Sequence, residues 1–322
     1  MGLFVAKLRL FFYIMLFGCR FFVIFADMNG LSILIPTFND ECFELVGQLR
    51  QQALKLNVPF EILVGDDGSS DRNVVESNLR INQFEHCSCV LRPENSGRAV
   101  IRNVLGRMAR YDTLLFIDSD MSVIRQDYLS RYINSLNKSN DVVYGGYELT
   151  VHLQDNLRSR YEDFCADNHT AEKRALHPYL DFHTSNFACP ASVFHQHPLD
   201  ERFRSYGYED VFYGRQLKDA GIAIRHIDNP LGFGRFESNA DYLRKTEEGL
   251  RTLWRFREDL QGYSRLLDSV RSLRQLHLLP LVRLWHRCLG GAERRQLMGN
   301  RPRLFLFNLY RLGYFASLDA GH

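Results

Sequence analysis

The sequence lacks the cysteine patterns of disulfide-rich or zinc-binding proteins. Its seven cysteines are scattered over 322 residues, without a CxxC pair or histidines at zinc-ligand spacing. This argues against a disulfide framework and a structural zinc site, and it predicts reduced thiols, as in the cytosol. Internal repeats, low-complexity linkers and Gly/Ser hinges are also absent. With 45% hydrophobic and 24% charged residues, the chain is typical of a globular protein of one large or two ordinary domains.

Lysine is missing from the C-terminal part of the chain. Residues 251–322 contain 13 Arg, no Lys and 5 acidic residues, a net charge of +8. Because the whole chain carries +2, residues 1–250 carry −6. This asymmetry predicts an anionic surface as the partner of the basic tail, and a cation or metal-bound ligand for the acidic body.

The first 27 residues are apolar but lack a cleavage site of the A-x-A kind. Residues 10–26, LFFYIMLFGCRFFVIFA, are apolar enough for a membrane segment, although Arg20 interrupts them and a charge near the bilayer centre costs about 2.5–3.5 kcal/mol. A cleaved signal peptide is not expected. Two interpretations stay open: a short anchor, or an extension upstream of a domain that begins at Met28.

Short apolar runs alternate with segments of helical length from Leu31 onward. The runs are LSILIP, FEILVGDD, SCVLRP and TLLFIDSD, at 31–36, 60–67, 88–93 and 113–120. This alternation predicts an α/β fold with a mostly parallel sheet covered on both faces. Ligands of such sheets bind at the carboxyl ends of the strands. The residues expected along this edge are Asn39, Asp66, Asp67, Asn95, Asp118 and Asp120.

The pattern continues less regularly beyond residue 120. It predicts helices over 126–137, 156–175 and 238–258, and strands in DVVYGGYEL (141–149) and IAIRHI (222–227). The segments LLPLVRLWHRCLGG (278–291) and RPRLFLFNLYRLGYFASL (301–318) combine aromatic and leucine residues with arginines. That composition favours helices lying in a membrane interface; the alternative is a helical lid packed on the domain with its arginines in water.

Asp118 and Asp120 directly follow an apolar strand. Two carboxylates at this position can converge on one hard cation such as Mg²⁺ or Mn²⁺, held jointly by a diphosphate. The alternative is that they cap the next helix.

The turn 66–71, DDGSSD, follows another strand, and Gly68 permits the tight turn. An acid here can accept hydrogen bonds from a pyrimidine imide or a ribose hydroxyl. Alternatively, the turn serves to cap the helix beginning near Arg72, a role that suits Asp71.

The segment ENSGRAVIRN (94–103) places Gly97 at a helix start, with Arg98 and Arg102 one turn apart. This arrangement suits a site near a phosphate or ribose, although such arginines often lie on a solvated helix face.

In YGYEDVFYGRQL (206–217), Glu209 and Asp210 lie between glycine and aromatic residues. A partly apolar environment there would raise a carboxylate pKa towards that of a general base. The alternative is that both acids are N-terminal charges of a helix over 210–220.

Taken in order, PTFN (36–39), DDGSSD, NSGRAVIRN, DSD (118–120) and YGYED resemble the family-2 glycosyltransferases of the GT-A fold, over residues 31 to about 240. The resemblance implies that Asp67 recognises the base, Asp118 contacts ribose or metal, and Asp120 is the main metal ligand. Asp210 would be the base that deprotonates the acceptor hydroxyl, with Glu209 holding the acceptor or orienting that base. The other residues implied near the nucleotide sugar are Pro36, Thr37, Asn39, Arg98, Arg102 and Asn186.

Two departures from the family pattern matter. Some relatives carry a metal-binding histidine beyond the Asn-Pro step, where this chain has LGFGRFE (231–237), so His226 is the candidate substitute. Its alternative is a histidine that ends a strand and bonds to backbone. The QxxRW-type motif of polymerising members is absent around both tryptophans. We therefore expect one sugar to be added per encounter.

The sequence thus predicts an N-terminal segment (1–27), a GT-A domain (28–245) and a basic helical region (246–322). The expected reaction is the inverting, Mg²⁺- or Mn²⁺-dependent transfer of a sugar from a nucleotide-sugar donor, with a UDP-sugar expected first, to a glycan or lipid-linked acceptor. A nucleic acid partner is not expected. The expected location is the inner face of the plasma membrane. Alternatives are a sugar-phosphate nucleotidyltransferase, whose Gly-rich basic loop is missing from IPTFNDE, and a non-catalytic sugar-binding protein.

Overall fold

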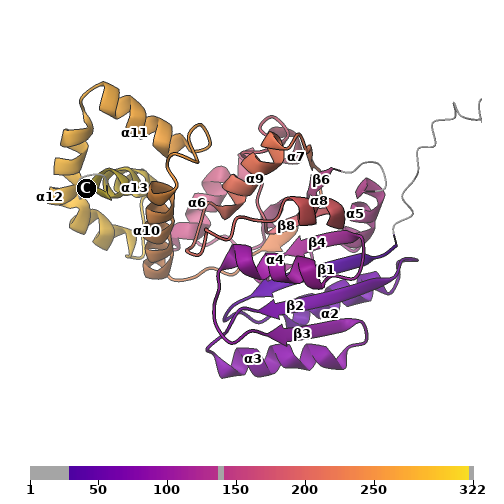
Figure 1. The fold of residues 1–322 in the computed structure, drawn as a ribbon. Coiled ribbons are helices and arrows are strands. Elements are labelled where there is room, and N and C mark those ends of the chain that lie inside the picture. The colour runs from indigo at the N-terminus through magenta and orange to yellow at the C-terminus, as the bar shows by residue number, and fades with distance from the viewer. Residues whose placement is uncertain (1–28, 137–140, 319–322) are drawn as a thin grey trace, which may run out of the picture.

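The computed structural model describes residues 29–136 and 141–318 (Figure 1). Its main sheet has seven strands in the order β3-β2-β1-β4-β8-β6-β9. These strands are β1 (Leu31–Thr37), β2 (Phe60–Asp66), β3 (Cys87–Leu91), β4 (Thr113–Ile117), β6 (Val142–Tyr144), β8 (Asn186–Pro190) and β9 (Ile224–His226). All neighbours pair in parallel except β8, which runs antiparallel to β4 and β6. The mostly parallel sheet is therefore confirmed.

Helices cover both faces of this sheet. Alternate residues of β1 face opposite layers, with Ile33 and Ile35 in one core and Leu34 in the other. The first layer contains α2 (Phe43–Ala53) and α5 (Tyr128–Leu136), and the second α4 (Arg98–Met108), α8 (Ala191–Gln196) and α9 (Glu209–Asp219). Every residue of β1 and β2 is buried, which explains why these strands read as continuous apolar runs. Helix α3 (Arg72–Leu79) leads into η1 (Arg80–Gln83), whose Ile81 is buried in the same core as α2.

A second, three-stranded sheet is formed by β5 (Met121–Ser122), β10 (Leu231–Phe233) and β7 (Tyr147–Leu149). The strand expected over 141–149 is thus two strands in different sheets, divided at Gly145-Gly146. Gly146 has φ +83°, and a Cβ on Gly145 would lie 2.5 Å from the Asn229 carbonyl oxygen. The helix expected over 156–175 is also divided, into α6 (Leu157–Cys165), η2 (Ala166–Asn168) and α7 (Ala171–Arg174).

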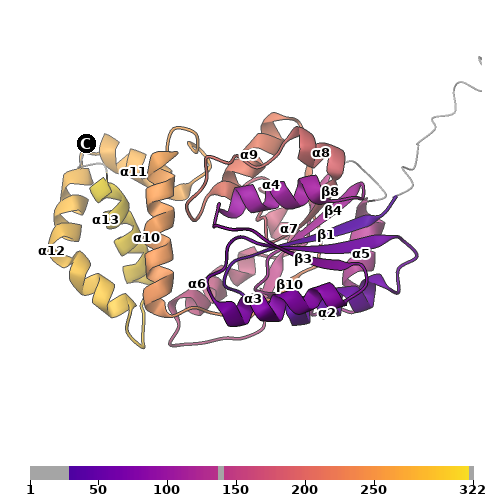
Figure 2. The same ribbon diagram turned by 60° about the horizontal axis from the view of Figure 1, so that its bottom comes forward.

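The C-terminal part consists of α10 (Asn239–Arg255), α11 (Arg265–Gln275), α12 (Leu279–Leu297) and α13 (Leu304–Leu318), grouped at one end of the molecule (Figure 2). Helix α10 runs across the boundary expected at residue 245. Phe203 and Phe212 from the sheet-containing part share a core with Leu250 of α10 and Phe315 of α13. The C-terminal helices therefore pack directly on the segment that carries α9.

Of the two C-terminal segments expected in a membrane interface, α13 packs one side into the interior, although its Phe305 is 75% exposed. Phe307, Tyr310 and Phe315 are all at most 3% exposed. For α13 the packed-lid interpretation therefore fits. No helix within 29–136 or 141–318 has the length and apolarity needed to cross a membrane. The apolar segment 1–27 lies outside the described residues.

Candidate active site

The carboxyl ends of β2, β1 and β4 lie side by side, because β1 is the middle strand of the three. Pro36, Thr37, Asp67, Asp118 and Asp120 at these ends line one cavity of about 610 Å³. We refer to these five residues as the strand-end wall and to this cavity as the first cavity. Asn39, Arg98 and Arg102 line the same cavity. Its size is in the range of ordinary ligand pockets.

The carboxylate of Asp67 holds the loop that precedes α4. The backbone N–H groups of Ser96 and Gly97 each donate to its Oδ2 at 2.9 Å, and the Ser96 hydroxyl donates to Oδ1 at 2.7 Å. Gly97 has φ +97°, and a Cβ there would lie 2.7 Å from the Arg204 carbonyl oxygen. Asp67 thereby fixes the start of the helix that carries Arg98 and Arg102, while its contact with a base stays a prediction.

Asn39 shapes the DDGSSD turn from the neighbouring strand. Its Oδ1 accepts the backbone N–H of Ser70 at 2.8 Å and of Asp71 at 3.0 Å. Asp71 in turn accepts the backbone N–H of Asn73 at 3.0 Å and caps α3. The capping interpretation of Asp71 is confirmed, and Asn39 acts on the turn that presents Asp67.

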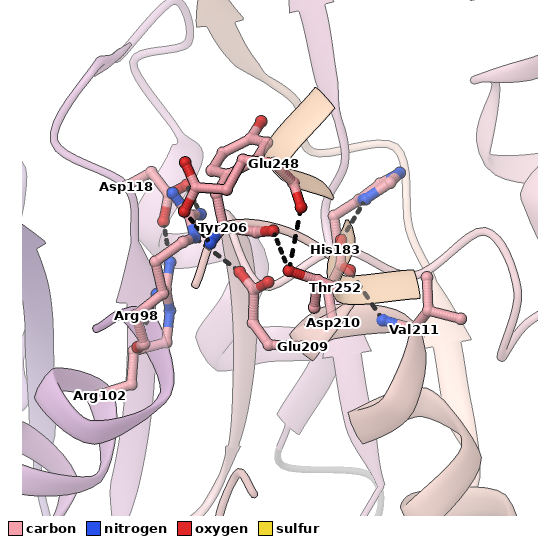
Figure 3. A network of polar contacts seen from close by, with 10 residues as sticks. All are labelled: Arg98, Arg102, Asp118, His183, Tyr206, Glu209, Asp210, Val211, Glu248 and Thr252. Atoms are coloured by element: carbon pink, nitrogen blue, oxygen red, sulfur yellow. Dashed lines mark hydrogen bonds and ion pairs between the residues drawn. The ribbon is translucent and has the colours of Figure 1, made fainter. Parts of the chain in front are cut away.

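Two arginines converge on Asp118 (Figure 3). Arg98 Nη2 donates to Asp118 Oδ2 at 2.8 Å, and Arg102 Nη2 forms an ion pair with Oδ1. Arg98 Nε also donates to Glu209 Oε1 at 2.6 Å, while Glu209 Oε2 is buried and has no hydrogen-bond partner among the described residues. Burial alone would raise the pKa of Asp118, but Arg102 and Arg98 outweigh it and lower the pKa. The network joins β4, α4 and the start of α9.

Asp120, two residues further on, is in the opposite situation. No described residue donates a hydrogen bond to its carboxylate. Burial and the neighbouring charge of Asp118 raise the pKa of Asp120 to about 6. The side chain lines the first cavity and two adjoining ones. A cation bound beside this carboxylate would stabilise its ionised form, which burial and the charge of Asp118 disfavour.

The loop 206–210 faces the strand-end wall, and α10 holds it in place. Gly207 and Tyr208 both have positive φ, +94° and +69°, so the chain makes a tight bend before α9 begins at Glu209. Glu248 Oε1 accepts the Tyr206 N–H at 2.9 Å, and the Thr252 hydroxyl donates to the Tyr206 carbonyl at 3.0 Å (Figure 3). The position of Asp210 therefore depends on a helix about forty residues further along the chain.

Asp210 lines a second cavity of about 390 Å³ and is paired with His183. His183 Nδ1 lies 2.9 Å from Asp210 Oδ2. Burial alone would raise the pKa of Asp210, but the hydrogen bond and charge of His183 outweigh it and lower the pKa. The expected rise thus does not occur at Asp210. Conversely, burial would lower the pKa of His183, but Asp210 raises it. His183 was missed from the sequence, because 27 residues separate it from its partner.

A pair of basic residues not expected from the sequence borders both cavities. Glu237 Oε2 accepts from Arg158 Nη1 at 2.8 Å, and Glu237 Oε1 lies 3.0 Å from Lys245 Nζ. Arg98 and Lys245 lie 6.0 Å and 5.9 Å from the ring centre of Tyr206. No motif marks this pair, since Arg158 comes from α6 and Lys245 from α10, and a loop between them in the sequence supplies Glu237.

Two expected site residues line neither cavity. Asn186 is fully buried; its Oδ1 accepts from the Tyr128 and Tyr132 hydroxyls, and its Nδ2 donates to the Gly146 carbonyl. His226 uses both ring nitrogens, with Nε2 2.9 Å from the Pro178 carbonyl and Nδ1 3.2 Å from Arg174 Nε. Asn186 thus supports the end of β8, and for His226 the strand-end, backbone-bonded interpretation fits.

Among the expected metal ligands, only Asp120 has the free oxygens that a cation needs. The arginines occupy both oxygens of Asp118, and His226 is engaged elsewhere. In the described part of the chain, no group of three or more His, Cys, Asp or Glu side chains is arranged to hold a metal. Mg²⁺ or Mn²⁺ would therefore rest on Asp120 and on oxygens of a bound ligand, a donor set that suits hard cations.

The profile of glycosyl transferase family 2 matches residues 32–203 of this chain. The chain therefore belongs to this family, as its motifs predict. The match contains the whole strand-end wall and His183 and ends just before the loop 206–210.

Similar proteins include two synthases of Pasteurella multocida. Chondroitin synthase of strain Pm70 is 24% identical over 290 residues, covering 80% of this chain and 30% of the relative. Hyaluronan synthase is 25% identical over 240 residues, covering 63% and 24%. The chain thus spans less than a third of the length of these curated relatives.

Among solved structures, the mannosyltransferase PcManGT from Pyrobaculum calidifontis, in complex with GDP-Man and Mn²⁺, has a similar fold. The TM-score is 0.55 at 13% identity, with 90% of this chain and 86% of that chain covered. At this identity the likeness concerns the fold, and it confirms the GT-A arrangement.

Proposed function

We propose that this protein transfers a single sugar, with inversion, from a nucleotide-sugar donor to a hydroxyl of a glycan or lipid-linked acceptor. A UDP-sugar is the first donor to test, and surface polysaccharide or glycan synthesis is the proposed setting. The observation that carries the proposal is the placement of two carboxylates. Asp120 borders the first cavity and Asp210 the second, and the two cavities share six lining residues: Arg98, Asp118, Asp120, Arg158, Tyr206 and Lys245.

Asp210 is suited to accept the proton of an acceptor hydroxyl. A general base must be unprotonated before reaction, and the lowered pKa of Asp210 keeps it ionised at neutral pH. His183 fixes the carboxylate through Oδ2, and the raised pKa of His183 favours the protonated, positively charged ring beside it. With the donor on the strand-end side, the hydroxyl attacks from the opposite face of the sugar. Displacement in one step then inverts the anomeric centre.

Asp120 and the basic residues are suited to the leaving nucleoside diphosphate. Mg²⁺ or Mn²⁺ held by Asp120 would neutralise negative charge that develops on the diphosphate. Arg158 and Lys245 both pair with Glu237, and Arg158 Nε also lies 4.0 Å from Glu162 Oε1. Both basic side chains line the two cavities, where a diphosphate would meet them. Asp118 instead keeps Arg98 and Arg102 in fixed positions at the cavity wall.

The test is nucleoside diphosphate release from a panel of UDP-, GDP- and dTDP-sugars with Mn²⁺, combined with calorimetric titration of the same donors. We expect one donor class to bind and to be turned over. Asp210→Asn should lose turnover by about 10²–10⁴-fold and keep donor binding. Asp219→Asn, at the exposed end of the same helix, is the matched control. Full transfer activity in Asp210→Asn would remove the base assignment.

Turnover by a nucleotidyltransferase would instead consume a sugar phosphate and a nucleoside triphosphate. A non-catalytic protein would bind a donor without releasing nucleoside diphosphate. Either result would overturn the proposal. Family membership and the presence of Asp67, Asp120 and Asp210 favour the transferase.

A further inference from the structure

One face of α12 exposes large apolar side chains. Leu281, Leu284 and Trp285 are 61%, 57% and 44% exposed, and Leu278 and Leu289 are 40% exposed each. Residues spaced by three and four positions lie on the same side of a helix, so these five side chains form one stripe. We refer to them as the α12 face. The opposite side of α12 packs on α13 through buried Leu279 and Leu297 and through the close approach of Gly313 of α13 to His286.

The exposed charges that α12 itself carries beside this face are positive. Arg287 lies at the edge of the stripe and Arg295 continues it two turns on, and both are exposed. The acid of this helix, Glu293, is 5% exposed and accepts a hydrogen bond from Trp285 Nε1 at 2.8 Å. The surface around the leucines therefore presents guanidinium groups without exposed carboxylates from α12.

We propose that the α12 face docks on the surface of an anionic lipid bilayer. Leucines and a tryptophan on one side of a helix, bordered by arginines, match both the apolar and the charged layer of such a surface. A second copy of this chain fits less well, because two α12 faces in contact would bring their arginines together. Docking would place the protein at the inner face of the plasma membrane, whose cytoplasmic leaflet carries anionic lipids.

Trp285 provides a local probe of this docking in the full chain. The protein has two tryptophans, and the other, Trp254, packs in the core shared by α10 and α13. We expect vesicles of phosphatidylcholine with phosphatidylglycerol to sediment the protein and to shift Trp285 emission to the blue. Pure phosphatidylcholine vesicles and high salt should abolish the shift. Trp285→Phe should remove the shift, which assigns it to this helix rather than to residues 1–27.

Variants then test the face itself. Leu281→Ser with Leu284→Ser should lower vesicle affinity by about tenfold or more, and Arg287→Gln by about fivefold. Leu54→Ser with Leu176→Ser, at exposed positions on other elements, is the matched control and should change nothing. Circular dichroism checks that each variant is folded.

No blue shift with anionic vesicles, or an equal shift with neutral ones, would overturn the proposal. So would a concentration-dependent dimer in sedimentation velocity that Leu281→Ser with Leu284→Ser dissolves, because the second copy would then be the occupant. None of these readouts requires the transferase activity, so the two proposals can fail separately.

Discussion

The two walls of the site are built in different ways. The strand-end wall consists of five residues between positions 36 and 120, and they lie at the ends of three adjacent strands along one sheet edge. The opposite wall, loop 206–210, bends through two positive-φ residues and is fixed by Glu248 and Thr252 of α10. The first wall therefore follows from strand order alone. The second requires contacts between segments that are far apart in the sequence.

The difference extends to the acids. Asp118 and Asp120 leave the same strand, yet their pKa values shift in opposite directions. Arg98 and Arg102 bond directly to Asp118 and lower its pKa, whereas burial and the charge of Asp118 raise the pKa of Asp120. Asp210, on the other wall, is kept ionised by a histidine from a third segment. Asp118 is thus suited to hold the wall, Asp120 to meet a cation, and Asp210 to accept a proton.

The largest expected effect comes from Asp120→Ala. Removing the one carboxylate with free oxygens in the strand-end wall should reduce transfer by about 10³-fold or more and abolish its dependence on Mn²⁺. Asp127→Ala, an exposed acid just beyond β5, is the control. The measurement is steady-state transfer with and without Mn²⁺. Unchanged metal dependence in Asp120→Ala would mean that the metal, if used, binds elsewhere.

Asp118→Asn tests the structural role assigned to its carboxylate. The change leaves Arg102, which is 1% exposed, without its carboxylate partner, so the free energy of unfolding should fall by about 3–5 kcal/mol. Asp120→Asn should show no such loss, because its charge is disfavoured in the fold. Chemical denaturation of both variants makes the comparison. Equal stability of the two would show that the arginine network does not distinguish them.

His183→Gln tests the contrast between the acids of the two walls through the pH dependence of kcat/KM. In the wild type His183 helps to keep the pKa of Asp210 below its usual range, so Asp210 stays ionised well into the acid pH range. Without the histidine the effect of burial remains, and the acid limb of kcat/KM should move to higher pH. His177→Gln, an exposed histidine after α7, is the control. An unchanged acid limb would show that His183 does not influence the pKa of Asp210.

The same pair contributes to stability in a defined pH range. The pKa of His183 is raised above 6.5 in the fold, so its contribution is complete below pH 6.5 and is lost as the pH rises through the folded value. The stability difference between wild type and His183→Gln should therefore shrink towards alkaline pH.

Much of the strand-end wall was predictable from the sequence. Parallel strands buried on both faces read as continuous apolar runs, and the polar residues that end them must meet at one edge. This reasoning located Asp67, Asp118 and Asp120 in one cavity, and the segment ENSGRAVIRN at a helix start located Arg98 and Arg102 beside them. It did not reveal that the arginines occupy Asp118, because side-chain pairing across elements leaves no periodic signal.

The other wall was predictable only in part. YGYED marked Asp210, but His183, Arg158 and Lys245 come from separate elements and carry no motif. Asn186 and His226 were expected near the ligand from their position in the chain, and tertiary hydrogen bonds use them elsewhere. The two-strand division of 141–149 likewise depends on the close approach of Asn229 to Gly145.

Thr252→Val gives the smallest expected effect and tests how tightly α10 controls the loop. Valine has a similar shape but cannot donate a hydrogen bond to the Tyr206 carbonyl, and the loss of this bond costs about 1 kcal/mol. If the loop must stay in place during transfer, kcat/KM should fall by about fivefold. Thr252→Ser keeps the hydroxyl and should restore activity. Donor affinity should change little in either variant, because Thr252 lines neither cavity. A serine variant as impaired as the valine variant would attribute the loss to packing in α10, and the loop would then owe its position to Glu248 and to the bend at Gly207.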